Sequence, residues 1–290
     1  MTARMRLLAV LLLLPGCGGQ LPSLSDVSSR ESLQALARVG ATTLTISAEK
    51  EAEIGRIVAG TVIAREPLLD NEAITRYVEL VGHAVAEQSI RRGDVAFRFG
   101  VLDSDQVNAY AAPGGYIFVT LGTLAVLQSE AQLAGILAHE VAHVDARHVV
   151  EELRRAGVLQ AVREEADLTG PVLDRIAGAG SSLLFTGLTR EDEFEADALG
   201  LLYASGAGYR ADALLSFLEQ VARLEGNPDE RGRLRSLRAT HPPAGERLEA
   251  MRASLQTLPG GGEGGVELTQ RYRERVLDLL PERPPLPAGG

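Results

Sequence analysis

The clearest helical pattern of apolar and polar positions lies between Ser129 and Glu152. Apolar residues recur there at the spacing of a buried helix face, at Leu133, Ile136, Leu137, Val141, Val144 and Val149. Ser129 followed by Gln132 is typical of the capping box that begins a helix. The pattern predicts one long, buried helix over 129–152.

The remaining patterns predict further helices around a small sheet. Residues 48–65 and 70–92 have helical spacing and are separated by Glu66-Pro67, and an amphipathic helix is expected over 211–224. Large apolar residues occupy alternate positions over 95–101, and β-prone residues fill 107–112 and 116–121 around Pro113-Gly114-Gly115. We expect a mainly helical α+β fold with a small, mostly antiparallel sheet beside the 129–152 helix.

The first 19 residues differ in character from the rest. A basic start precedes the apolar run 7–14, which stops at Pro15-Gly16-Cys17. Such a segment is too short to span a bilayer and is typical of a secretory signal. The sequence LPGC over 14–17 resembles a bacterial lipobox, which implies lipid attachment at Cys17, with a plain cleaved signal as the alternative. Gly18 rather than Asp after the cysteine implies the outer membrane of a Gram-negative bacterium.

Composition and charge narrow the function. The 290 residues are 45% hydrophobic and 4% aromatic, which suits a helical core rich in Ala, Leu and Val. A formal net charge of −10 argues against a nucleic-acid partner. No second run of 18 apolar residues follows the signal, so we expect a soluble body that meets the membrane through the lipid anchor only. The only cysteine is Cys17, which excludes disulfides within the chain.

These patterns divide the chain into four parts. A signal peptide is expected over 1–19, a tether and N-terminal segment over 20–47, and one folded domain over 48–256. Residues 257–290 read as a Gly/Pro-rich linker, a short helix and a tail.

A metal site is predicted by His139, Glu140 and His143 within the 129–152 helix. Four residues correspond to about 400° of helical rotation, so the two histidines project from one face, one turn apart. Glu140 lies about 100° round, where it can take a proton from a water at the metal without being a ligand. This is the HExxH pattern of zinc hydrolases.

The predicted metal site needs a third protein ligand in addition to the two imidazoles. His148 stands one position short of the third histidine of a longer HExxHxxGxxH pattern, so an acidic ligand is needed. Glu193 is favoured because Asp197 shares its helix face one turn on, where an acid can orient a ligating histidine. Thr189 and Asp192 are expected to begin that helix. The other acidic candidates are Glu164, Glu165 and Glu195, and Glu193 as an ordinary solvated acid is the alternative.

Together these residues resemble the HtpX, Oma and CaaX-prenyl-protease family of zinc metallopeptidases, and most closely its periplasmic BepA/LoiP-like lipoprotein branch. The resemblance covers about 48–255 and rests on four motifs: NAYAAPGGYIFVT over 108–120, HEVAH over 139–143 followed by ARH over 146–148, TREDEFEADALG over 189–200, and THPP over 240–243 with Arg247. It implies a zincin-like domain over 48–256. It also implies one Zn²⁺ per chain held by His139, His143 and Glu193, with Glu140 as the general base and Asp197 behind a ligand.

The resemblance also suggests roles in catalysis and substrate binding. His241 either donates to the developing oxyanion or, as a neutral ring, binds zinc and blocks a resting enzyme, while Arg247 neutralises a carboxylate or fixes the loop. A purely structural histidine is the alternative. If the strand near 115–119 is a sheet edge beside the metal, an extended substrate can add to it. The residues expected to bind substrate are Asn108, Gly114, Gly115 and Tyr116, with an ordinary hairpin turn as the alternative.

The sequence thus predicts a zinc-dependent endopeptidase of the cell envelope that degrades misfolded or unassembled envelope proteins in the periplasm. An alternative from another class is a zinc-stabilised lipoprotein chaperone or scaffold for outer-membrane assembly with little proteolysis. Glu140 argues against that alternative, because a structural zinc site needs no base. HExxH alone would also permit a metal hydrolase that does not cleave peptides.

Overall fold

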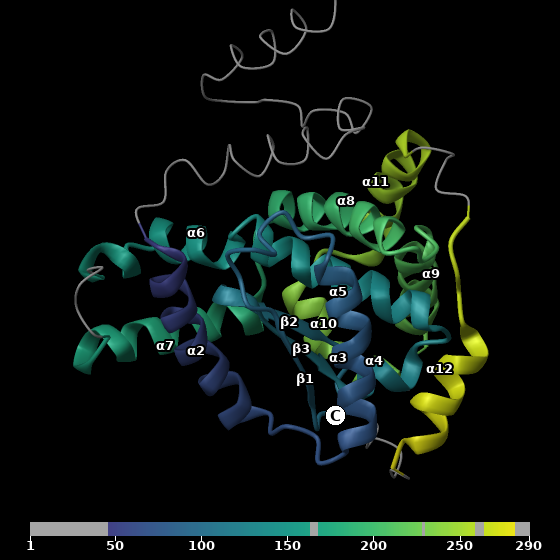
Figure 1. The fold of residues 1–290 in the computed structure, drawn as a ribbon, viewed down its shortest axis with the longest axis horizontal. Helices are drawn as coiled ribbons and strands as arrows, with labels where there is room; N and C mark the ends of the chain where they lie inside the picture. The colour runs from purple at the N-terminus through teal and green to yellow at the C-terminus, as the bar shows by residue number, and fades with distance from the viewer. Residues whose placement is uncertain (1–45, 163–167, 228–229, 259–263, 282–290) are drawn as a thin grey trace, which may run out of the picture.

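The computed structural model describes residues 46–162, 168–227, 230–258 and 264–281. These residues form a mainly helical body around a small sheet (Figure 1), which confirms the predicted α+β class. The predicted signal with Cys17, the tether up to residue 45, the acidic candidates Glu164 and Glu165, and the tail 282–290 lie outside the described residues.

The helices follow the predicted spacing closely. The expected helices over 48–65 and 211–224 are confirmed within two residues, whereas the one expected over 70–92 covers only Glu72–Ala86. The α-helices are α2 (Ala48–Arg65), α3 (Glu72–Ala86), α4 (Leu121–Val126), α5 (Glu130–Asp145), α6 (His148–Arg155), α7 (Gly170–Thr186), α8 (Arg190–Gly206), α9 (Ala213–Glu225), α10 (Arg235–Thr240), α11 (Ala244–Thr257) and α12 (Thr269–Arg275).

The sheet has three strands, β1 (Arg98–Leu102), β2 (Ala109–Ala112) and β3 (Tyr116–Thr120), in the order β1-β3-β2. Strand β3 pairs antiparallel with β2 and parallel with β1. The sheet is therefore mixed rather than mostly antiparallel, and β3 is its central strand rather than an edge. Alternation along a strand indicates which side chains are buried but not which strands are neighbours, so the pattern carried no signal for this order.

The turn between β2 and β3 explains its two glycines. Gly114 and Gly115 have φ angles of 68° and 88°, a region that L side chains rarely adopt. A Cβ on Gly114 would also lie 2.5 Å from the Cα of Ala52 in α2. A tight turn and the close approach of a second backbone both require glycine here.

Helix α5 forms the centre of the fold, and all 16 of its residues are buried. The Ser129 hydroxyl caps it by accepting a hydrogen bond from the Gln132 N–H, which is one half of the predicted capping box. The Gln132 side chain accepts from the Gln128 N–H rather than from that of Ser129. The single helix expected over 129–152 is wrong, because α5 ends at Asp145 and α6 begins at His148. Between them Arg147 has φ 59° and ψ 29°, a left-handed conformation that interrupts the helix and leaves no trace in the hydrophobic spacing.

Helix α8 crosses α5 closely (Figure 1). A Cβ on Gly200 of α8 would lie 3.1 Å from the backbone N of His139. Glu193, Asp197 and Gly200 are spaced i, i+4 and i+7, so they lie along one face of α8. The crossing therefore places the acids of α8 against the histidines of α5.

The short helix expected after residue 257 packs into the domain. The Tyr272 side chain of α12 is fully buried, and its hydroxyl donates to the Leu124 carbonyl oxygen at 2.7 Å. Arg271 forms an ion pair with Glu130, the first residue of α5. Residues 264–281 thus contribute to the same hydrophobic core as the helices before them.

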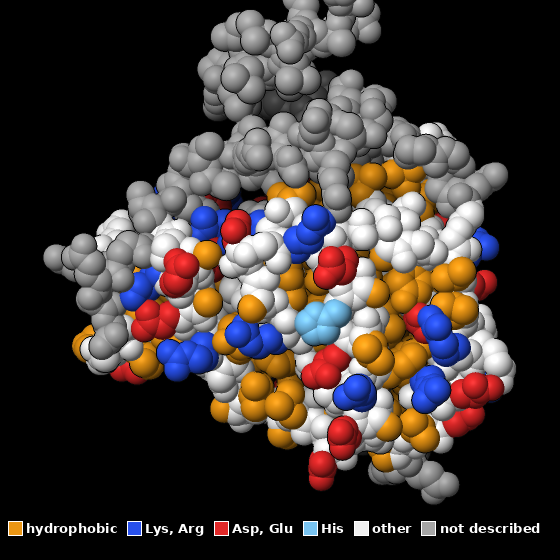
Figure 2. All heavy atoms as spheres, viewed as in Figure 1, with side chains coloured by type: hydrophobic (Ala, Val, Ile, Leu, Met, Phe, Trp, Pro, Cys, Tyr) orange, Lys and Arg blue, Asp and Glu red, His pale blue; other side chains and the backbone are white. Residues whose placement is uncertain are grey.

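Within the described ranges, no helix combines the length and the apolar character needed to cross a bilayer. On the face that α3 crosses, acidic and basic side chains are interspersed with hydrophobic ones (Figure 2). That face concentrates neither sign of charge.

Candidate metal centre

Two histidines of α5 face each other inside the domain. His139 and His143 are 3% and 4% exposed, and their Nε2 atoms lie 3.0 Å apart. Their spacing of four residues places both rings on one face of the helix, one turn apart. The structure therefore brings together the pair that the sequence singled out.

Glu193 of α8 joins these histidines. Its Oε2 lies 3.6 Å from His139 Nε2, and its Oε1 lies 3.6 Å from His143 Nε2. The side chain is buried, and Oε2 has no hydrogen-bond partner among the described residues. Burial alone would raise the pKa of Glu193, but His241 and His139 lower it to about 2. The cluster therefore contains a charged, buried carboxylate with one oxygen that lacks a hydrogen-bond donor.

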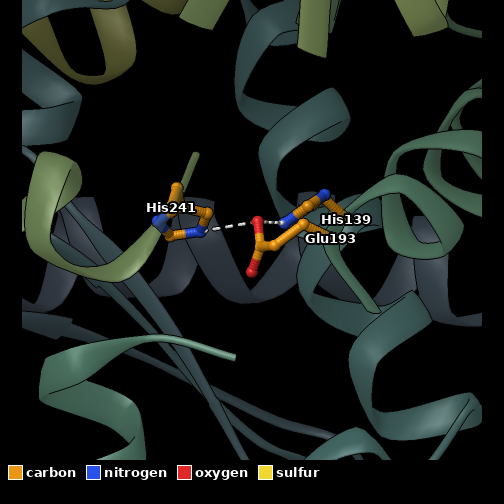
Figure 3. Close-up of side chains that lie close together, drawn as sticks. All are labelled: His139, Glu193 and His241. Atoms are coloured by element: carbon orange, nitrogen blue, oxygen red, sulfur yellow. Dashed lines mark ion pairs between the residues drawn. The ribbon is translucent and has the colours of Figure 1, made fainter. Parts of the chain in front are cut away.

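His241 follows α10 and approaches the same carboxylate from the opposite side to His139 (Figure 3). Its Nε2 lies 3.6 Å from Glu193 Oε2, and its Nδ1 lies 2.7 Å from Thr240 Oγ1. Burial lowers the pKa of His241 to about 4, so the ring is neutral near pH 7 and can offer a lone pair. One potential ligand atom from each of His139, Glu193 and His241 lies within 4.8 Å of the other two.

Asp197 and Arg247 support His139 from behind. Asp197 Oδ1 lies 3.0 Å from His139 Nδ1, and the Arg247 guanidinium donates to both Asp197 oxygens at 2.9 and 2.6 Å. Burial opposes the charge on Asp197, but Arg247 and His139 lower its pKa to about 2. Burial also opposes protonation of His139, yet Asp197 and Glu193 raise its pKa to about 9. Arg247 thus pairs with a carboxylate, in keeping with one of its two expected roles.

A small cavity of about 20 Å³ lies beside these groups, lined among others by Asn108, His139, Glu140, His241 and Arg247. That volume accommodates about one water molecule. Burial, partly opposed by His139, raises the pKa of Glu140 to about 7. A carboxyl group with a pKa near neutrality beside a water-sized space is suited to exchange protons.

These residues fit a zinc ion. Zinc in proteins is bound by histidine nitrogen and carboxylate oxygen, and catalytic sites use three protein ligands. His139, His143 and Glu193 supply that donor set. A cation also accounts for the buried Glu193 Oε2, since a buried charged oxygen without a hydrogen bond requires some other partner.

Comparison with known proteins identifies the family. The sequence model of Peptidase family M48 matches residues 72–255, which include every group described above. The chain belongs to peptidase family M48. The predicted family and the predicted class of metallopeptidase are thereby confirmed.

Curated relatives of this M48 chain cover much of its length. The beta-barrel assembly-enhancing protease of Yersinia pestis is 28% identical over 227 residues, which are 72% of this chain and 44% of that protein. The protein of the same name from Escherichia coli is 25% identical over 256 residues, 83% of this chain and 50% of that protein. Mitochondrial metalloendopeptidase OMA1 of Schizosaccharomyces pombe is 30% identical over 159 residues, 53% of this chain and 45% of that protein. The chain spans about half the length of these relatives.

The structure places only one of the four expected substrate-binding residues beside the cavity. Asn108 lines the cavity, whereas Gly114 and Gly115 pack against neighbouring backbone and Tyr116 lies under the Arg98 guanidinium. The condition for substrate to add to the strand near 115–119 is not met, because both sides of β3 are already paired. The edge strand beside the cavity is β2, which begins directly after Asn108.

His148, for which the sequence predicts no role, contacts a predicted ligand of the M48 site. Its Nδ1 lies 2.8 Å from His143 Nδ1, and its side chain is buried. A signal was present, because the ARH motif places a histidine five residues after His143. In a continuous helix those residues would point about 140° apart, and only the left-handed turn at Arg147 brings them together.

Proposed function

We propose that this M48 protein is a zinc-dependent endopeptidase of the bacterial cell envelope. The observation that carries the proposal is the buried Glu193 Oε2, which lacks a hydrogen-bond partner and faces the Nε2 atoms of His139 and His241 at 3.6 Å each. The names of the relatives, beta-barrel assembly-enhancing protease and metalloendopeptidase, support proteolysis and an envelope setting. The proposed substrates are misfolded or unassembled envelope proteins.

His139, His143 and Glu193 would hold the zinc. When bound, zinc supplies a Lewis acid that polarises the scissile carbonyl and lowers the pKa of water. Glu140 lines the water-sized cavity, where it accepts a proton from the attacking water and then donates it to the leaving amine. Its raised pKa suits both transfers near neutral pH. Asp197 holds the Nδ1 side of His139 and so directs the Nε2 lone pair into the cluster.

Replacement of Glu140 tests this chemistry. Glu140→Gln should bind zinc like the wild type but lose at least about a hundredfold in peptide hydrolysis, the usual size of a general-base contribution. Casein degradation and metal analysis provide the two readouts. Glu191→Gln removes an exposed acid on α8 and should change neither. Full activity of Glu140→Gln would reject the role of the base, and zinc retained by Glu193→Ala would reject the ligand set.

His241 is proposed to block the resting site. Its neutral Nε2, 3.6 Å from Glu193 Oε2, is close enough to serve as a further ligand, and a cavity of about 20 Å³ leaves no room for a peptide. His241→Ala should therefore raise basal proteolysis. If His241 instead stabilises the developing oxyanion, the same change lowers kcat at constant zinc content. Unchanged turnover together with unchanged zinc affinity would reject both roles.

Substrates are proposed to bind along β2 as an added strand. Main-chain hydrogen bonds at a sheet edge demand little of the sequence, which suits unfolded proteins. In this structure Ser236 of α10 contacts the start of β2, at 2.8 Å from Asn108 Nδ2 and 3.2 Å from the Tyr110 hydroxyl. Helix α7 also packs against this strand, since the ring centroids of Phe185 and Tyr110 lie 5.3 Å apart. Because Ser236→Ala removes both of the Ser236 contacts, it should raise basal proteolysis, as His241→Ala should. A decrease would argue that α10 supports the active form.

The proposed location is the periplasm, with a lipid anchor at Cys17 in the outer membrane. The support is the apolar run 7–14 and the LPGC boundary in the sequence. Mass spectrometry of the membrane-extracted N-terminal peptide should find Cys17 as an acylated first residue. An unmodified N-terminus downstream of Cys17 would reject the anchor.

A further inference from the structure

We infer that His148 is a positioning residue that fixes the tautomer and the ring orientation of the proposed ligand His143, an inference that rests on the proposed function. The Nδ1 atoms of the two buried rings lie 2.8 Å apart. On its far side, His148 Nε2 lies 3.5 Å from Glu195 Oε2 and 3.7 Å from Asp192 Oδ1. His148 is therefore held between acids of α8 and a histidine of α5.

The ligand role proposed for His143 determines the direction of these hydrogen bonds. A metal ligand at His143 requires a lone pair on Nε2, the nitrogen that faces Glu193 Oε1 at 3.6 Å. The hydrogen of that ring then lies on Nδ1 and is donated to His148 Nδ1 at 2.8 Å. His148 Nδ1 must therefore accept, which places the hydrogen of His148 on Nε2, the nitrogen that faces the Glu195 and Asp192 carboxylates.

The two histidines of HEVAH are thus supported by different chemistry. The Asp197 carboxylate lies behind His139 and can only accept, so the His139 Nδ1 atom that faces it carries a hydrogen. Behind His143 stands a second imidazole, which can either donate or accept. The tautomer of His143 therefore depends on what lies behind His148, and Glu195 supplies that constraint across an intervening ring.

The turn between α5 and α6 holds His148 in this place. Arg147 adopts φ 59° and ψ 29°, which is uncommon for a residue other than glycine. Its Nε lies 2.9 Å from the Oε2 of Glu51, and its Nη2 donates to the Ile46 carbonyl oxygen at 3.1 Å. A strained conformation secured by a buried acid one residue before His148 indicates that the position of this histidine matters.

The tautomer can be tested in the zinc-free full chain by long-range ¹H–¹⁵N NMR of the histidine rings. In the wild type, His143 should already carry its proton on Nδ1 before zinc is added. In His148→Leu, which removes the acceptor, the Nε2–H form of His143 should become populated. A wild-type His143 protonated on Nε2, or a His143 signal that His148→Leu does not change, would overturn the inference.

Zinc affinity gives a second readout, measured by competition with a chromophoric chelator. His148→Leu should weaken binding by about 10- to 100-fold, the usual effect of losing the group behind a ligating histidine. His148→Asn places an amide near the former Nδ1, whereas His148→Gln places one near the former Nε2. Affinity should recover in His148→Asn more than in His148→Gln. The control His83→Leu, at an exposed histidine of α3, should leave affinity unchanged.

The outcomes separate this inference from the proposed function. If His148→Leu binds zinc with wild-type affinity and gives an unchanged cobalt(II) absorption spectrum, the role of His148 is overturned. It is also overturned if this variant lowers the Tm of the zinc-free protein without any loss of zinc affinity. If His148→Leu does not fold, equal affinities of the Asn and Gln variants overturn it instead. A wild type that neither binds zinc nor cleaves casein would reject the proposed function, whereas the NMR result would still decide whether His148 sets the tautomer of His143.

Discussion

Replacement of Glu51 by glutamine should destabilise the zinc-free domain by about 3–5 kcal/mol. The Glu51 side chain of α2 is fully buried and lies between two arginines. Arg91 donates to both carboxylate oxygens at 3.0 and 2.8 Å, and Arg147 Nε lies 2.9 Å from Oε2. The two arginine side chains are themselves only 14% and 11% exposed.

The magnitude follows from the charges that remain. Two unit charges 4 Å apart interact with about 4 kcal/mol at an effective dielectric constant of about 20. Glu51→Gln keeps the shape of the side chain but leaves Arg91 and Arg147 without their counter-charge, and breaking a buried ion pair from one side costs about 3–5 kcal/mol. For a domain of this size, that loss corresponds to a decrease in Tm of roughly 6–20 °C.

Urea unfolding of the zinc-free protein, followed by circular dichroism, measures the effect. Glu49→Gln is the matched control, because Glu49 is an exposed acid on the same helix and its replacement should change stability by less than about 0.5 kcal/mol. The double variant with Arg147→Met should recover part of the loss, since one unpaired cation is then removed. A free energy of unfolding for Glu51→Gln within about 1 kcal/mol of the wild type would refute the reasoning.

Two further predictions concern an acid and a turn. Burial opposes the charge on Glu130, but hydrogen bonds from Arg271 and two tyrosines lower its pKa below the usual 4.5. The charged carboxylate therefore stabilises the folded state fully above about pH 4.5, and this stabilisation is lost as the pH falls through the lowered pKa. In Glu130→Gln the urea midpoint of unfolding should therefore decrease less than in the wild type as the pH is lowered. A variant whose urea midpoints keep the wild-type pH dependence would contradict this. Gly114→Ala should cost at least about 1–2 kcal/mol for its left-handed conformation, and more because the added Cβ would lie 2.5 Å from Ala52 Cα. Gly93→Ala, where an added Cβ meets nothing within 4 Å, is the control, and equal stability of both variants would contradict the prediction.

Local signals were enough to predict most of the side chains that gather around Glu193. His139 and His143 are one turn apart on a single helix, so their spacing in the sequence is also their spacing in space. The capping pair Thr189 and Asp192 indicated where α8 begins. Within a helix that begins there, the spacing of four residues places Glu193 and Asp197 on one face. These groups needed only one contact between distant segments, the crossing of α8 over α5.

The errors arose where structure depends on distant partners or on one backbone angle. The order β1-β3-β2 is set by pairing between strands that alternation cannot identify, so the sheet was predicted to be mostly antiparallel and the central place of β3 was not predicted. The left-handed Arg147 divides the helix expected over 129–152, and its side chain pairs with Glu51, nearly a hundred residues earlier in the chain. The contact between His143 and His148 follows from that same angle, so it was missed for the same reason.

One short helix connects the two groups that stand in the way of the proposed substrate. Ser236 of α10 covers the start of the edge strand β2, and His241, the residue directly after α10, faces Glu193. Because Ser236 and His241 lie at the two ends of one short element, a single displacement of α10 would free the start of the strand and withdraw the histidine together. An extended substrate that binds only the open form would then shift the population toward activity by its own binding energy. Such gating requires no separate regulatory site, and it predicts that Ser236→Ala and His241→Ala raise activity less than additively, because each favours the same open form.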